Sequence, residues 1–324
     1  MNNLKNLIIF FIIISATFFY FFQKDKLKNH FFSEQSQILM DTIVTIRIYG
    51  EDKKELDKTI SECFKCMRKL EKKLSNYIPN SEISLINKNA GIKPVKVDKV
   101  VIEFLQKSIK LCELTKGYLD ITIGKLINLW GFNSGHPNLP PKNEIEKALK
   151  FKGLDKIFID KKNNIVFINQ KGIYIDVGAV AKGFIVDKAI DFLKKKGIKK
   201  GVINAGGDLR FIGLKDNGEY WTVGIKNPYS ENPNDYIKTV KVGNWAIATS
   251  GDYERFFIKN GKRYCHILNP FTGYPAREFH SVTVEAESAF LADGLATAIF
   301  VMGKKYKKIL KNIKINHLKI ITIP

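Results

Sequence analysis

The stretch Gly172-Ile-Tyr-Ile-Asp-Val-Gly-Ala-Val-Ala-Lys-Gly183 predicts a strand that leads directly into a helix. The strand ends at Asp176, and the small residues after it allow a ligand to approach the backbone closely. Free N–H groups at the start of a helix attract phosphate. The run matches neither a G-x-G-x-x-G fingerprint nor a P-loop. Its pattern leaves open both a phosphate site and an ordinary tight strand-to-helix turn.

The elements on either side of this stretch indicate the α+β class, because helices and strands are mixed without a regular βαβ period. Neither a linker nor an internal repeat follows residue 35, so 35–324 is expected to form one folded body. The expected strands are Ile38–Tyr49, Gly172–Val177 and Ser281–Glu285, with others between Gly201 and Ile258. The expected helices are Asp52–Leu74, Lys99–Thr115, Ala181–Lys196 and Ala286–Met302. We expect Ser75–Lys96 to be a loop and Lys156–Asn169 to be a hairpin that turns at Asn163-Asn164.

Residues 1–30 differ from this body. Leu7–Phe22 is an uncharged, mostly apolar run with lysines on both flanks. Its length suits a short transmembrane helix or a long signal-peptide core. The run ends in the bulky Phe18–Phe22 without a small-x-small cleavage site, so we expect an uncleaved membrane anchor. Lysines on both flanks leave its orientation undetermined by the positive-inside rule.

The formal net charge of +21 raises the question of nucleic-acid binding. Nearly all the positive charge is lysine spread along the chain, whereas bidentate recognition of bases and phosphates favours arginine. We therefore expect a solvated lysine-rich surface and no nucleic-acid partner. Attraction to anionic lipid or to an acidic protein remains open.

Cys63 and Cys66 form a C-x-x-C inside a predicted helix, with no second pair of metal ligands nearby. Four cysteines in a chain of 324 residues are too few for a disulfide scaffold. We expect a surface or semi-buried pair rather than a redox or zinc site. The sequence also lacks H-x-x-x-H and G-x-S-x-G, which argues against a zinc enzyme and an α/β-hydrolase.

Two C-terminal segments carry groups suited to catalysis. His266 begins the Pro/Gly-bounded run His266-Ile-Leu-Asn-Pro-Phe-Thr-Gly273, and an imidazole suits a general base. Asp293 and Thr297 are four residues apart and share one face of a predicted helix. A carboxylate and a hydroxyl oxygen suit Mg²⁺. The alternatives are a loop histidine satisfied by backbone and a hydrogen bond along the helix.

These segments, taken in order, resemble the ApbE family, the FAD:protein FMN transferases. The resemblance runs from about Ile38 to the C-terminus. It rests on Met40-Asp-Thr42, Ser75-Asn-Tyr77 with Ser81-Glu-Ile-Ser84, Gly117-Tyr-Leu-Asp-Ile-Thr-Ile-Gly124 with Leu129-Trp-Gly-Phe132, Asp176-Val-Gly-Ala-Val-Ala-Lys-Gly183, Asn204-Ala-Gly-Gly-Asp208, His266–Gly273 and Ala292-Asp-Gly-Leu-Ala-Thr-Ala298. Each motif is weak by itself, but all of them in this order are specific.

The resemblance implies a two-lobed α+β domain, with mixed sheets and flanking helices, that binds FAD between its lobes. It implies Mg²⁺ held by the Ala179 carbonyl and the side chains of Asp293 and Thr297, and it makes His266 the base. The implied FAD-binding residues are Met40, Tyr77, Tyr118, Leu119, Asp120, Asp176, Lys182 and Ile267.

The implied reaction is Mg²⁺-dependent phosphoryl transfer. FMN passes from FAD to a Thr or Ser hydroxyl of a target protein through a phosphoester bond, and AMP leaves. Family members act on flavin-acceptor domains of membrane redox complexes, which implies a body on the periplasmic side of the inner membrane. Asn269 stands where many members have Asp, and their lipid-modified cysteine is absent, so attachment is assigned to Leu7–Phe22.

Two alternatives accompany this hypothesis. A Mg²⁺-dependent FAD pyrophosphatase would use water as the acceptor and give FMN and AMP. A non-catalytic FAD-binding protein would retain FAD and release no AMP. The presence of His266, Asp293 and Thr297 favours an enzyme.

Overall fold

The computed structural model describes residues 31–132, 134–215, 217–230, 232, 234–311 and 313–324. The strands are β1 (Phe31–Leu39), β2 (Thr42–Gly50), β3 (Val95–Lys96), β4 (Ile157–Asp160), β5 (Ile165–Ile168), β6 (Gly201–Ala205), β7 (Asp208–Ile212), β8 (Trp221–Lys226), β9 (Tyr236–Val242), β10 (Ala246–Gly251), β11 (Phe256–Lys259), β12 (Lys262–Cys265), β13 (Ser281–Ala286) and β14 (Leu318–Ile323). The helices are α2 (Lys53–Leu74), α3 (Glu82–Lys88), α4 (Lys99–Leu114), α5 (Gly124–Trp130), α6 (Lys142–Leu149), α7 (Ala181–Lys195), α8 (Ala289–Met302) and α9 (Tyr306–Leu310), with the short 3-10 turns η1 (Leu154–Lys156) and η2 (Gly303–Lys305).

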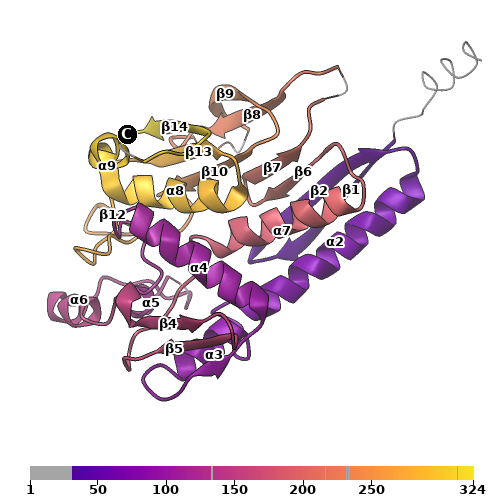
Figure 1. Ribbon diagram of the computed structural model, residues 1–324. Helices are drawn as coiled ribbons and strands as arrows, with labels where there is room; N and C mark the ends of the chain where they lie inside the picture. The colour runs from indigo at the N-terminus through magenta and orange to yellow at the C-terminus, as the bar shows by residue number, and fades with distance from the viewer. Residues whose placement is uncertain (1–30, 133, 216, 231, 233, 312) are drawn as a thin grey trace, which may run out of the picture.

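A seven-stranded antiparallel sheet in the order β1-β2-β6-β7-β10-β13-β14 forms the larger lobe. Helices α2, α7 and α8 lie across one face of this sheet (Figure 1). The β8–β9 ribbon packs on the other face, through an apolar cluster that includes Phe211, Ile225 and Val242. The sheet is therefore covered on both sides, and the predicted α+β class is confirmed.

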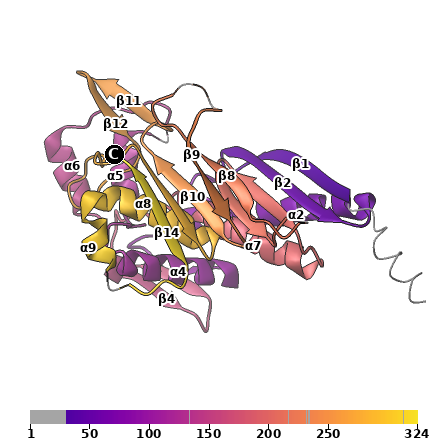
Figure 2. The same ribbon diagram turned by 90° about the horizontal axis from the view of Figure 1, so that it is seen from above.

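A smaller lobe contains α3, α5, α6 and the three-stranded sheet β3-β5-β4 (Figure 1). Part of it has its own apolar cluster, centred on the fully buried Trp130 and including Tyr264 and Leu268 from the β12 segment. The indole of Trp130 donates to the Gly273 carbonyl at 2.9 Å. The segment that carries His266 is therefore fixed to this lobe. Figure 2 shows the β11–β12 hairpin and α6 at the same end of the molecule.

The first predicted strand, Ile38–Tyr49, is wrong as a single element. The chain reverses at Met40 and Asp41, both with φ of 55°, and β1 and β2 pair as a hairpin that begins at Phe31, before the predicted boundary at residue 35. A two-residue turn of this kind normally carries Asn-Gly or Asp-Gly, so Met-Asp gives no turn signal. The Glu71 carboxylate accepts the Met40 N–H at 2.7 Å, a long-range contact that stabilises the turn.

The predicted strand Gly172–Val177 is also wrong, because only Tyr174 forms a bridge, parallel to Ile123. On one side of this segment, the Asn87 side chain forms the hydrogen bonds that a neighbouring strand would otherwise form. Asn87 accepts the Ile175 N–H at 2.7 Å and donates to the Ile175 carbonyl at 2.8 Å. The segment is extended and buried but stands outside any named strand, which the alternation of apolar residues could not reveal.

The remaining expectations fit closely. The hairpin at Asn163-Asn164, strand β13 and helices α2, α4 and α7 are confirmed, and α8 begins a turn later than predicted, after the Ser288 cap. The loop Ser75–Lys96 contains α3 and the short β3. Leu7–Phe22 lies outside the described residues, and no helix within the described ranges is long and apolar enough to cross a membrane.

Candidate functional site

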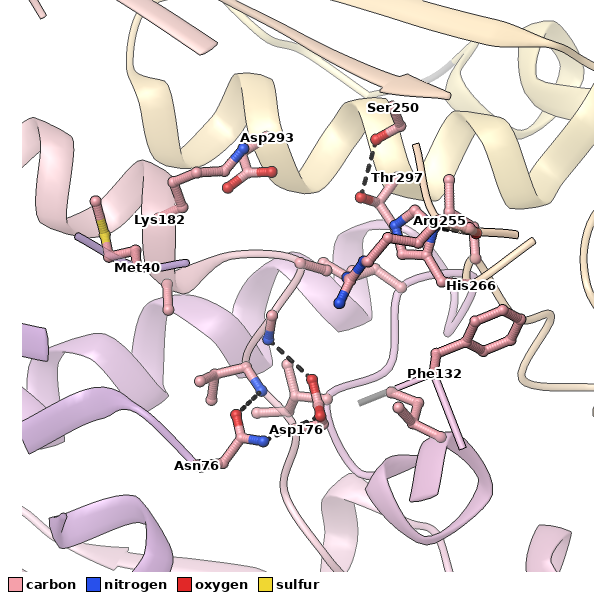
Figure 3. A pocket seen from close by; sticks show the side chains of 18 of the residues that line it. Met40, Asn76, Phe132, Asp176, Lys182, Ser250, Arg255, His266, Asp293 and Thr297 are labelled. Carbon is pink, nitrogen blue, oxygen red and sulfur yellow. Dashed lines mark hydrogen bonds between the residues drawn. The ribbon is translucent and has the colours of Figure 1, made fainter. Parts of the chain in front are cut away.

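A cavity of about 560 Å³ lies where the two lobes meet, a size within the usual range for ligand pockets. Every residue that the sequence indicated for the site lines it: Met40, Tyr77, Tyr118, Leu119, Asp120, Asp176, Ala179, Lys182, His266, Ile267, Asp293 and Thr297. They come from the β1–β2 turn, the segments after α2, α4 and β12, the segment before α7, and helices α7 and α8. The tertiary structure thus brings together residues spread over most of the chain (Figure 3).

Asp176 lies on the floor of the cavity in a network of donors. Its carboxylate accepts from the Asn76 amide and the Tyr77 hydroxyl, each at 3.1 Å, and from the Gly178 N–H at 2.9 Å. Burial raises the pKa of this carboxyl, and the donors oppose that shift. The network holds the turn before α7 in a fixed shape, with Tyr77 still 46% exposed at the cavity.

The wall formed by Tyr118 and Asp120 is fixed in a similar way. Asp120 accepts from the Thr122 N–H at 2.8 Å and from the Thr122 hydroxyl at 2.6 Å. Tyr118 packs edge-on against Phe271, with ring centroids 5.0 Å apart. Since Phe271 is 52% exposed, this aromatic pair lies between the cavity and solvent.

Lys182, in the first turn of α7, is a half-buried cation near three carboxylates. It forms a salt bridge with Asp208, and the charges of Asp293 and Glu254 also act on it. Burial alone would lower the pKa of Lys182, but these carboxylates raise it. Arg255 and Lys226 also act on Glu254, so the acidic charge around Lys182 is concentrated at Asp208 and Asp293.

The carboxyl of Asp293 reflects this concentration of acidic charge. Burial and the neighbouring Asp208 and Glu254 raise its pKa to about 7, although Lys182 and the Gly183 N–H act in the opposite direction. Its Oδ2 accepts the Gly183 N–H at 3.1 Å. One turn along α8, the Thr297 hydroxyl lies 3.2 Å from the hydroxyl of Ser250 (Figure 3).

The Ala179 carbonyl completes a set of oxygen donors. In a regular helix the Gly183 N–H would donate to it, but that N–H donates to Asp293 instead. Among the described residues, no hydrogen bond reaches the Ala179 carbonyl. A carboxylate, a hydroxyl and an unpaired carbonyl are the hard oxygen ligands that Mg²⁺ prefers. The residues present therefore fit the metal that the resemblance implies.

His266 lies on the opposite wall and is held by a single carbonyl. Its backbone N–H and its Nδ1 both contact the Arg255 oxygen, at 3.0 and 3.2 Å. A carbonyl can only accept, so this contact assigns the ring hydrogen to Nδ1 and leaves the Nε2 lone pair available. Burial, then the Arg255 guanidinium, lower the pKa of His266 to about 3. The imidazole is therefore neutral at physiological pH.

Other residues of the cavity were not singled out from the sequence. Arg255 and Glu254 precede β11, and Ser250 is the penultimate residue of β10. Their signal was the run Ser250-Gly-Asp-Tyr-Glu-Arg255, a charged turn between strands just upstream of His266. Figure 3 shows the Arg255 side chain beside His266, which brings a second cation to the cavity.

Asn269 does not line the cavity. Its side-chain oxygen accepts from the Phe271 and Thr272 N–H groups at 2.8 and 3.3 Å and so stabilises the loop. Both Asn and Asp supply that acceptor, which explains why either residue suits the position.

The C-x-x-C pair lies apart from the cavity on α2, and the expectation of a semi-buried structural pair is confirmed. Cys63 is buried and Cys66 is partly exposed, and neither forms a disulfide. Burial raises the pKa of the Cys63 thiol to about 12, so no thiolate forms at physiological pH. Across the described residues, no group of three His, Cys, Asp or Glu side chains could hold a metal ion.

Comparison with known proteins gives consistent matches. Residues 40–321 match the model of the ApbE family. The FAD:protein FMN transferase of Vibrio cholerae serotype O1 is 34% identical over 248 residues, which cover 76% of this chain and 73% of that protein. The crystal structure of the ApbE protein from Thermotoga maritima superposes with a TM-score of 0.80 at 36% identity, covering 90% of this chain and 94% of that one. The flavin transferase ApbE from Vibrio cholerae gives a TM-score of 0.78 at 30% identity, with 90% and 93% covered.

Proposed function

The chain belongs to the ApbE family, and from that premise we propose that it is an FAD:protein FMN transferase that acts on a Thr or Ser hydroxyl. The acceptor oxygen attacks the phosphorus of the FMN half of FAD, and the bond to the AMP phosphate breaks. The products are a phosphoester-linked flavoprotein and AMP. FAD occupies the cavity lined by Met40, Tyr77, Tyr118, Leu119, Asp120, Asp176, Lys182 and Ile267.

His266 takes the proton of the acceptor hydroxyl in this proposal. Its Nε2 carries a lone pair because the Arg255 carbonyl holds the ring hydrogen on Nδ1. The Phe132 ring, with its centroid 6.4 Å from that of the imidazole, supports the orientation of the ring. The neutral imidazole has a lone pair free for this proton, and the negative charge of a bound pyrophosphate would raise its pKa from about 3 toward the range of an effective base.

Two cations of the chain offset the charge of the pyrophosphate. Lys182 is anchored by Asp208 on one side of the cavity, and Arg255 lies beside His266. Asp293, Thr297 and the Ala179 carbonyl would hold Mg²⁺, which when bound stabilises negative charge on the phosphate oxygens. Gly178 leaves the backbone exposed in the turn before α7, where N–H groups can approach a phosphate.

The observation that carries the proposal is the Ala179 carbonyl, left without a hydrogen bond among the described residues beside Asp293. A protein that only stored flavin would have no need of this set of metal ligands across from a neutral histidine. The direct test incubates the protein with FAD and Mg²⁺, with and without a flavin-acceptor domain. Mass spectrometry of the acceptor should show one added FMN, with AMP released only when the acceptor is present. AMP release without an acceptor would instead identify a pyrophosphatase.

The acceptor is proposed to be a flavin domain of a membrane redox complex, and Leu7–Phe22 to anchor the enzyme in the inner membrane with its body in the periplasm. Two features support this proposal. The segment is uncharged and mostly apolar, with a length that suits a short transmembrane helix, and the family assignment makes a protein the second substrate.

A further inference from the structure

A second, open groove lies on the back of the catalytic loop. It is lined by Leu139, Pro140, Lys142, Lys262, Tyr264, Thr272, Tyr274, Pro275 and Arg277. Its lining includes three cations and two tyrosines but no carboxylate. We propose that this groove binds an acidic segment of the acceptor protein and so presents the acceptor hydroxyl to the catalytic cavity. The inference rests on the proposed transferase function.

The cations of the groove are available to a partner. Lys142, Lys262 and Arg277 are all exposed, and within the described ranges neither Lys262 nor Arg277 has a salt bridge. The Arg277 guanidinium lies 4.7 Å from the ring centre of Tyr264, so it is oriented without being neutralised. Lys142 is 3.8 Å from Glu146 on the helix surface, a contact of little energetic weight.

The start of α6 adds to the positive potential. The cap residue is Pro141, which provides no side-chain acceptor, so the first N–H groups of this eight-residue helix are not capped by a side chain. Lys142 is the first residue of the same helix. A helix N-terminus and three cations on one surface, without a lining carboxylate, are complementary to an acidic polypeptide.

The position of the groove connects it to catalysis. Leu268 and Pro270 line the cavity, whereas Thr272, Tyr274 and Pro275 from the same loop line the groove. The two sides are joined by the Leu268–Pro275 bridge and by the Asn269 N–H, which donates to the Tyr274 carbonyl at 2.8 Å. An extended segment bound in the groove would therefore be separated from the cavity that contains His266 only by the loop from Leu268 to Pro275. Binding of a small anion would not require the groove to lie near His266, whereas a bound acceptor protein must bring its hydroxyl to that residue.

A binding experiment on the full chain tests the groove without relying on transfer. The probe is a fluorescein-labelled hexaglutamate peptide, followed by fluorescence anisotropy at low salt. The variant K262E/R277E should bind it about tenfold more weakly than the unmodified protein. The matched control is K238E/K241E, which makes the same change of net charge at exposed positions of β9, in a different sheet. The affinity of this control variant for the peptide should stay within about twofold of that of the unmodified protein. Equal losses in both variants would overturn the proposal, because only net charge would then matter.

Two further binding experiments distinguish an acidic protein from other partners. Phosphatidylglycerol vesicles and single-stranded dT20 replace the peptide. Binding of either that is abolished by K262E/R277E, with hexaglutamate binding unchanged, would reassign the groove to a membrane or a nucleic acid and overturn the proposal. In the transfer assay, K262E/R277E should raise the KM for the acceptor domain about tenfold and leave kcat and FAD affinity unchanged. If the peptide binds in the groove but no acceptor gains FMN, the transferase function fails while the acidic-peptide site stands.

Discussion

His266 shows how one carbonyl can prepare a side chain for proton transfer. The Arg255 backbone oxygen fixes the tautomer, and the Arg255 guanidinium together with burial keeps the ring neutral. Since the pKa of His266 is about 3 in the FAD-free cavity, the ring is neutral there between pH 5 and 9.

We expect His266→Ala to slow FMN transfer by about 10²–10⁴-fold and to leave FAD affinity nearly unchanged, because the ring acts on the acceptor proton. Single-turnover transfer to an acceptor domain and FAD titration measure the two effects. His136→Ala is the matched control, since His136 is exposed and does not line the cavity. A near-normal rate for the His266 variant would mean that another group accepts the proton.

The raised pKa of Asp293 predicts that metal binding depends on pH. Its carboxyl, with a pKa of about 7, is packed against Lys182, Asp208, Glu254 and the Gly183 N–H. Below pH 7 the protonated form dominates, so Mg²⁺ must displace a proton; above pH 7 the carboxylate is already present. Affinity for Mg²⁺ should therefore fall as pH drops from 8 to 6, by up to about tenfold per unit below the pKa.

Isothermal titration calorimetry of the FAD-free protein with Mg²⁺, in buffers of different ionisation enthalpy, measures both the affinity and the proton released. Asp293→Asn should weaken binding and abolish its pH dependence in this range. The same variant should lose Mg²⁺-dependent turnover. A pH-independent affinity in the unmodified protein would remove Asp293 from the metal site.

Among the elements, the crossing of α7 and α8 positions the site most directly. Lys182 comes from one helix and Asp293 from the other, and Gly183 lies where the two helices meet. A Cβ on Gly183 would lie 2.4 Å from the Ala289 carbonyl oxygen, which belongs to backbone and cannot rotate away. The distance between Lys182 and Asp293 therefore depends on the absence of a side chain at this position.

Gly183→Ala should lower the free energy of unfolding by about 1–3 kcal/mol, because the helices must separate to admit the methyl group. Urea unfolding followed by circular dichroism measures the change. Lys194→Ala, at an exposed position of the same helix, should change stability by less than about 0.5 kcal/mol. An unchanged midpoint of urea unfolding for Gly183→Ala would show that the contact between α7 and α8 is loosely packed.

At the scale of the whole molecule, the described residues that line the cavity all lie between Met40 and Val301. We expect the full-length chain to fractionate with membranes through Leu7–Phe22, and a chain that begins at Phe31 to be soluble and to transfer FMN at a normal rate. Ultracentrifugation followed by the transfer assay checks both statements. A full-length chain that remains in the supernatant would contradict the proposed anchor.

The sequence predicted the α+β class and most of the helices, and the residues that it singled out for the site all line one cavity. Periodicity was sufficient for helices such as α2 and α7, whose apolar faces pack on the sheet. It failed at Met40-Asp41, where a turn without a turn-forming sequence is held by Glu71. It also failed at Gly172–Val177, which pairs with Asn87 on one side and with residues 121–124 on the other, outside any named strand. Both errors arise from contacts between residues far apart in the chain.

The sequence by itself identified the family, since the identities and order of His266, Asp293, Thr297 and the Asp176–Gly183 turn are specific to it, and it supplied the groups on which the proposed chemistry depends. The tertiary structure alone decided the state of those groups. It frees the Ala179 carbonyl by directing the Gly183 N–H to Asp293, and it keeps His266 neutral by burying the ring and by placing Arg255 beside it. Burial and distance set hydrogen bonding and ionisation, and neither can be read from the chain before it folds.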